Sequence, residues 1–129
     1  MKAERLQRLL VLEVRRVVED LAARRDLLLM VWGKHRARAP FLETTHSRWT
    51  TLGFVDLGEL EPHQIEALDA FHRELDALRL YLAWTEDMPR NLALRYDMSL
   101  AKLRTLSGQA LTALGEAPLE PAALPWDEE

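Results

Sequence analysis

The chain has 129 residues, of which 48% are hydrophobic and 29% charged, and its formal net charge at pH 7 is −4. This length fits one domain with a core of its own, and this composition argues against a wholly disordered chain. Because the chain contains no cysteine, disulfides, cysteine-ligated zinc and thiol catalysis are excluded.

Charge is distributed unevenly along the sequence. Residues 1–38 hold ten basic and five acidic side chains, whereas residues 39–129 hold seven basic and sixteen acidic ones. The acidic excess is densest over residues 56–87, which carry nine acids and two bases. Either these segments pack beside each other and partly neutralise, or the basic end meets nucleic acid or an acidic partner.

Residues 2–32 are predicted to form one long helix. Their apolar positions recur at spacings of three, four and seven, which places them on one helical face. These positions are Leu6, Leu10, Val14, Val17, Leu21 and Leu28. Gly33 is expected to take the left-handed cap, with Pro40 beyond it. Charges throughout residues 1–20 argue against a signal peptide, so we expect a soluble, cytoplasmic protein that does not contact a membrane.

The next region, residues 37–60, gives the weakest pattern. Pro40 suits a first helical turn, and Phe41, Trp49 and Leu52 share a helical face. Several threonines and two glycines in the same stretch disfavour helix. The prediction is a short helix near residues 40–51, followed by a loop.

Two further long helices are predicted. One runs over residues 62–85, where Gln64 is placed to reach back to the preceding backbone. Its apolar seam is Leu68, Phe71, Leu75, Leu78 and Leu82. The other begins at residue 89 or 90 and runs to 114, with Gly115 and Pro118 ending it. Its stripe is Leu92, Tyr96, Leu100, Leu103, Ala110 and Leu114. The short link between them predicts antiparallel neighbours.

The predicted fold is therefore all-α: an antiparallel helical bundle of three long helices plus a short helix, over residues 1–115. Residues 116–129 are predicted to be a flexible acidic C-terminal tail, because they hold three prolines, five acids and no base. Trp126 is unusual in such a tail. It is expected to dock on the body of the protein or on a partner.

Two segments are apolar on nearly every side, one at residues 27–32 and the other at residues 78–84. A bundle helix normally shows one apolar stripe and one polar face, so each segment needs a cover on both sides. The cover is either the 37–60 region or a second copy of the chain, and symmetric dimers are the commonest oligomers. The candidate interface residues are Leu28, Met30, Trp32, Leu80, Tyr81 and Trp84.

No motif with a dedicated chemistry is present: the sequence lacks a nucleophile elbow, a phosphate-binding glycine loop and a dinucleotide fingerprint. No catalytic, cofactor-binding or metal residue is therefore assigned. The leading hypothesis is a noncatalytic α-helical interaction or regulatory protein, acting as a homodimer or on another protein.

Two alternative hypotheses stay open. The first is a nucleic-acid or nucleoprotein-associated factor that uses the basic N-terminal third, with Lys34, Arg36 and Arg38 as candidate contacts. The second is a metal-dependent helical-bundle enzyme in which His46 and His72 meet in space. The spacing of the four histidines does not favour the second, because no H-E-x-x-H pattern occurs.

Overall fold

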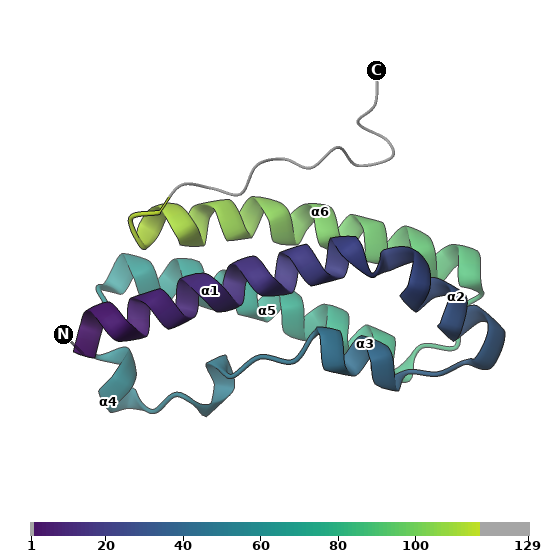
Figure 1. Ribbon diagram of the computed structural model, residues 1–129, viewed down its shortest axis with the longest axis horizontal. Helices are drawn as coiled ribbons and strands as arrows, with labels where there is room; N and C mark the ends of the chain where they lie inside the picture. Colours follow the sequence, from purple (N-terminus) through teal and green to yellow (C-terminus); the bar gives the residue numbers. More distant parts are fainter. Residues whose placement is uncertain (1, 117–129) are drawn as a thin grey trace, which may run out of the picture.

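A computed structural model describes residues 2–116, with the backbone alone at residues 2, 50 and 54. Every regular element in this range is a helix, which confirms the all-α prediction. The long helices lie lengthwise beside one another (Figure 1), and they are α1 (Lys2–Ala23), α2 (Arg25–His35), α5 (Pro62–Trp84) and α6 (Pro89–Ala113). The short elements are α3 (Ala39–Thr44), the 3₁₀ turn η1 (Trp49–Thr51) and α4 (Phe54–Leu57). Within residues 2–116, no helix has the length and apolar character needed to cross a bilayer.

Helices α5 and α6 form a hairpin joined by residues 85–88. Both begin with a proline, and Gln64 Oε1 accepts a hydrogen bond from the backbone amide of Glu61 at 2.9 Å, as predicted. Lys102 Nζ lies 3.2 Å from Glu74 Oε1, near the middle of the hairpin. Nearer the link, the Arg95 guanidinium lies 5.1 Å from the centre of the Tyr81 ring. Since the residue number rises on one helix as it falls on the other, the two helices run in opposite directions.

The predicted single helix over residues 2–32 is wrong in one respect: it is divided at Arg24 into α1 and α2. On α6, the buried Tyr96 hydroxyl donates a hydrogen bond to the carbonyl oxygen of Leu21 at 2.6 Å. In an unbroken helix that carbonyl would accept from the amide of Arg25. A side chain that enters the backbone ladder is a recognised cause of helix kinks. Arg25 then forms a two-pronged ion pair with Asp97, at 2.5 and 2.7 Å.

The predicted cap at Gly33 is also wrong. Helix α2 continues to His35, and Arg36 takes the left-handed conformation with φ of 53°. The Arg36 guanidinium lies 4.4 Å from the centre of the Trp32 ring, and this cation–π contact favours the ending at Arg36. Gly33 instead lies inside the helix beside Pro89, at the start of α6.

The connection over residues 36–61 differs from the predicted helix near residues 40–51. Helix α3 ends at Thr44. The hydroxyls of Thr44 and Thr45 donate to the carbonyl oxygens of Pro40 and Phe41, each at 2.9 Å, and local bonds of this kind make a helix less favourable to continue. The connection then returns the chain along the molecule, so α5 starts beside the start of α1 (Figure 1). Gln7 and Gln64 meet there, with Nε2 and Oε1 3.5 Å apart. Helices α1 and α5 therefore run in the same direction, each opposite to α6.

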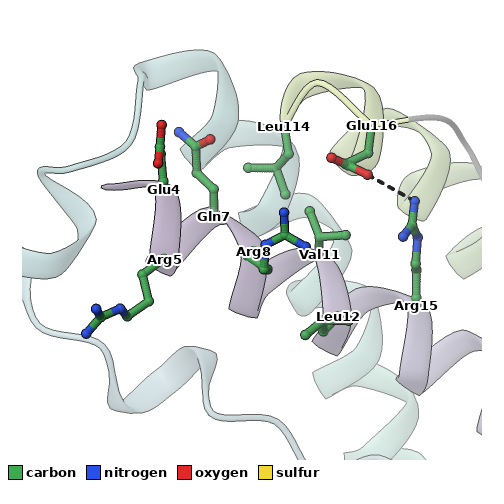
Figure 2. Close-up of a pocket in the computed structure, with 9 residues that line it drawn as sticks. All are labelled: Glu4, Arg5, Gln7, Arg8, Val11, Leu12, Arg15, Leu114 and Glu116. Carbon is green, nitrogen blue, oxygen red and sulfur yellow. Dashed lines mark hydrogen bonds and ion pairs between the residues drawn. The ribbon is translucent and has the colours of Figure 1, made fainter. Parts of the chain in front are cut away.

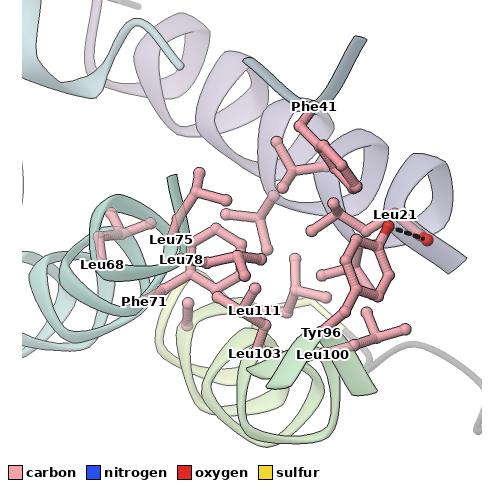
Figure 3. Packing of buried hydrophobic residues seen from close by; sticks show 14 of the residues in the cluster. Leu21, Phe41, Leu68, Phe71, Leu75, Leu78, Tyr96, Leu100, Leu103 and Leu111 are labelled. Atoms are coloured by element: carbon pink, nitrogen blue, oxygen red, sulfur yellow. Dashed lines mark hydrogen bonds between the residues drawn. The ribbon is translucent and has the colours of Figure 1, made fainter. Parts of the chain in front are cut away.

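The core is formed by the predicted apolar stripes of the long helices, together with Phe41 from α3. Figure 3 shows Phe41 entering between α1 and α5, and its ring centre lies 6.0 Å from that of Tyr96. Of the predicted stripe residues, all except the half-buried Leu6 are buried. Helix α3 thus covers the apolar side chains between α1 and α5, a position that the helical pattern of the sequence did not predict.

Helix α6 ends at Ala113, one residue before the predicted Leu114, and Gly115 takes the predicted capping position beyond it. The φ of Gly115 is 81°, its amide donates to the Thr112 carbonyl at 3.0 Å, and the Glu116 amide donates to the Leu111 carbonyl at 2.8 Å. This pair of bonds is a Schellman motif, which requires a left-handed residue where Gly115 stands. The predicted tail beyond residue 116, including Trp126, lies outside the described residues.

Candidate functional sites

Exposed apolar side chains gather at the end of the molecule where α5 turns into α6. Leu80 and Trp84 lie one helical turn apart on α5, and 79% of Trp84 is exposed. Leu94 and Met98 have the same spacing on α6 and are also exposed. We call the following set the apolar band: Leu27, Met30, Leu80, Trp84, Met88, Leu94 and Met98.

The pairing of the helices places the members of the apolar band at similar heights. Gly33 lies against Pro89, and Arg25 is paired with Asp97. The members on α2 and α5 therefore lie level with residues 88–98 of α6, a length of about 15 Å. Exposed apolar side chains at one end of a small protein are candidates for an association surface.

The structure distributes the six predicted interface residues over two environments. Leu28 and Trp32 are 2% and 0% exposed, so they are covered by the chain itself. Met30, Leu80 and Trp84 are exposed, and Tyr81 is half-buried, with its ring beneath Arg95. The sequence-based selection of interface residues missed Leu27, Met88, Leu94 and Met98. The four-residue spacing of Leu94 and Met98, off the buried stripe of their helix, is a signal that could have identified these two.

The basic cluster after α2 is bound to the link between α5 and α6. Arg38 donates through Nη2 to the Thr85 carbonyl and, at 2.9 Å, to Glu86 Oε1. Arg36 Nη1 donates to the carbonyl oxygen of Asp87 at 3.4 Å. Of the three predicted nucleic-acid contacts, Arg36 and Arg38 thus serve to join the basic and acidic parts of the chain, and Lys34 is exposed.

A small polar centre joins α1, α5 and the connection before η1. The Ser47 hydroxyl donates to Glu13 Oε1 on α1, and its oxygen accepts from the Trp49 amide at 3.1 Å. His72 Nδ1 on α5 lies 3.2 Å from the same oxygen. The imidazole is stacked on Trp49, with ring centres 4.9 Å apart, and only 6% of His72 is exposed. Burial lowers the pKa of His72 to about 4, against the opposing attraction of nearby Glu13.

Serine, histidine and glutamate meet here, but not in the order that nucleophilic catalysis requires. In a catalytic triad the histidine accepts the serine proton, and the acid orients the histidine. Here the proton of Ser47 is directed to Glu13, so we assign His72 Nδ1 as the donor and Nε2 as a buried acceptor. The adjoining cavity of about 40 Å³ has room for about one water molecule but not for a substrate. The centre is suited to fastening the connection onto α1 and α5.

His46 and His72 are not brought together as a metal site. His46 is exposed beside Leu9, Glu43 and Arg48, whereas His72 faces Ser47 in the buried centre. Over residues 2–116, no three histidine or acidic side chains cluster closely enough to hold a metal ion.

A groove runs between the first half of α1 and the end of α6, and its volume is about 720 Å³ (Figure 2). Arg8 and Arg15 of α1 lie on the side toward Leu114 and Glu116 of the other wall, and Arg5 extends away from them at the end of the groove (Figure 2). Arg15 Nη2 pairs with Glu116 Oε1 at 3.3 Å across the groove. Leu12, 54% exposed, lies at its edge. Three arginines and two acids are among the residues that line this groove, which we call the basic groove: Glu4, Arg5, Gln7, Arg8, Val11, Leu12, Arg15, Leu114 and Glu116.

Comparisons with known proteins do not add a function to these sites. No protein-family model, curated protein or solved structure matches the chain.

Proposed function

We propose that this protein is a noncatalytic α-helical interaction protein that associates with a second copy of itself through the apolar band. The observation that carries the proposal is the exposure of Trp84, at 79%, among other exposed apolar side chains at one end of the molecule. Tryptophan is among the residues that dominate binding energy at protein interfaces. Met30, Met88 and Met98 are also exposed toward this end of the molecule. Methionine is a side chain that adapts readily to a partner surface.

The charges beside the band favour a second copy over a partner of one charge sign. Glu86 and Arg90 are both exposed at the α5–α6 turn. A twofold axis brings the same patch of both copies together, so acids of one copy can face bases of the other. Such an association needs no cofactor, and it suits a reducing compartment such as the cytoplasm, since the chain has no cysteine.

Sedimentation equilibrium or light scattering at tens of micromolar tests the proposal on the full chain. We expect a dimer whose dissociation constant rises about 30-fold or more in Trp84→Ser, because an interface hot spot contributes about 2 kcal/mol or more. Val55→Ser is the matched control, since Val55 is 76% exposed but lies on α4, outside the band. A strict monomer, or equal weakening by both substitutions, would contradict the homodimer.

A further inference from the structure

The end of α6 lies at the basic groove, because Leu114 and Glu116 are among the residues that line it. The Schellman motif at Gly115 fixes the direction in which the backbone leaves the helix. Leu114 is 7% exposed against α1, and Glu116 is held by Arg15 at 3.3 Å. The last described residue therefore already lies on the wall of the groove, and the segment that follows begins there.

The chemistry of residues 117–129 complements the groove. This segment carries four acids and no base, and its larger apolar side chains are Leu119, Leu124 and Trp126. The groove offers Arg5 and Arg8, which outnumber the one acid at that end, Glu4. Leu12, Val11 and Leu114 supply its apolar surface. Acidic groups matched to arginines, with apolar groups between them, provide both attraction and a place to bury apolar surface.

The length of the segment is sufficient, and its composition lowers the cost of binding. From Arg15 back to Arg5 the axis of α1 rises about 15 Å. Thirteen residues in extended conformation span up to about 40 Å. Three prolines restrict the backbone of the segment before it binds, which reduces the entropy lost on docking. Attachment at Glu116 also gives the segment an effective local concentration on the order of millimolar.

We propose that the basic groove is the docking site for residues 117–129 of the same chain, with the acids of the segment on Arg5 and Arg8 and Trp126 against Leu12. The segment then acts as a ligand in cis that covers the cationic face of α1. This assignment is independent of the apolar band, which lies at the opposite end of the helices, and of whether that band forms a dimer.

Paramagnetic relaxation in the full-length protein tests this docking. Because the natural chain has no cysteine, Ala123→Cys provides a unique site for a nitroxide spin label. We expect the amide signals of Arg8, Val11 and Leu12 to lose most of their intensity, while that of Leu28 in α2 is preserved. The losses should shrink as salt is added, since exposed charge pairs are screened.

A double charge reversal and a mixed sample distinguish docking in the groove of the same chain from contacts elsewhere or with another chain. Arg5→Glu with Arg8→Glu should restore the lost signals, whereas Arg73→Glu with Arg79→Glu, of equal charge change on exposed sites of α5 away from the groove, should not. A mixture of labelled ¹⁴N chain and unlabelled ¹⁵N chain should show no losses. Losses that appear only in the mixture, that fall outside the groove, or that survive Arg5→Glu with Arg8→Glu overturn docking in cis.

Discussion

The hydroxyl of Tyr96 and the carbonyl oxygen of Leu21 are joined by a hydrogen bond of 2.6 Å between two fully buried residues. The bond satisfies a backbone acceptor at the end of α1, where the helical ladder is interrupted. Next to it on α6, Asp97 holds Arg25 at the first residue of α2. Two consecutive residues of α6 therefore hold both sides of the break between α1 and α2.

Replacing Tyr96 with phenylalanine should destabilise the protein by about 1–3 kcal/mol. The substitution keeps the aromatic ring but leaves the Leu21 carbonyl buried without this donor, and an unsatisfied buried acceptor has a cost of that size. Urea denaturation measures the change in the free energy of unfolding. Tyr81→Phe is the control: its hydroxyl bonds to Asp87 in an exposed setting, so a smaller loss is expected. Equal losses in both variants would remove the special role of Tyr96.

Two glycine substitutions should have opposite effects on stability. Gly33→Ala should stabilise the protein by about 0.5–1 kcal/mol, because Gly33 lies inside α2 and alanine favours helix. A new Cβ there would lie 3.6 Å from Pro89 Cγ, which is an ordinary contact. Gly115→Ala should destabilise the protein by about 1 kcal/mol, because its φ of 81° is unfavourable for a residue with a side chain. Thermal or urea unfolding measures both free-energy changes. A loss of stability in Gly33→Ala would contradict the placement of Gly33 inside α2 and support the left-handed cap that the sequence predicted there.

Stability should fall as the pH decreases from about 6.5 to about 4 because His72 is buried in its neutral form. Its pKa is about 4 in the folded protein and 6.5 in the reference state. Above pH 6.5 neither state binds this proton, and between the two values the unfolded chain binds it while the folded chain does not. The full effect of this one group is roughly 3 kcal/mol, and it levels off below pH 4.

The contribution of His72 can be separated from those of the carboxylates by comparing variants. Urea denaturation at several pH values should give a flatter pH dependence for His72→Gln than for the natural protein. The exposed His63, replaced in the same way, serves as the control and should leave the slope nearly unchanged. If His72→Gln kept the full slope, the buried neutral histidine would not be its source.

Much of the fold was predictable because apolar spacing reports directly on which face of a helix is buried. The seam that runs from Leu68 to Leu82 and the stripe beginning at Leu92 are buried in the structure as predicted. Local capping signals at Gln64 and Gly115 were equally reliable, since each involves residues close in sequence. These features depend on one element at a time, and periodicity carries that information.

The errors concern contacts between elements distant in sequence. Nothing near Arg24 indicates a helix break, because its cause is Tyr96 on another helix. The sequence predicted a helix cap at Gly33. In the structure Gly33 lies inside α2 beside Pro89, and the contact between Arg36 and Trp32 favours a later helix end. For the candidate sites, the sequence indicated exposed apolar residues near Trp84. It could not indicate that Trp32 is covered by its own chain, nor that Ser47, His72 and Glu13 meet.

The shared direction of α1 and α5 has a consequence for how the chain folds. Helices α5 and α6 are joined by residues 85–88, so their pairing closes only a short loop. Packing of α1 against this hairpin closes a longer loop, which includes the whole connection over residues 36–61. During synthesis α1 emerges before α6, which covers much of the apolar face of α1. Until α6 has been synthesised, the apolar stripe of α1 therefore lacks this cover.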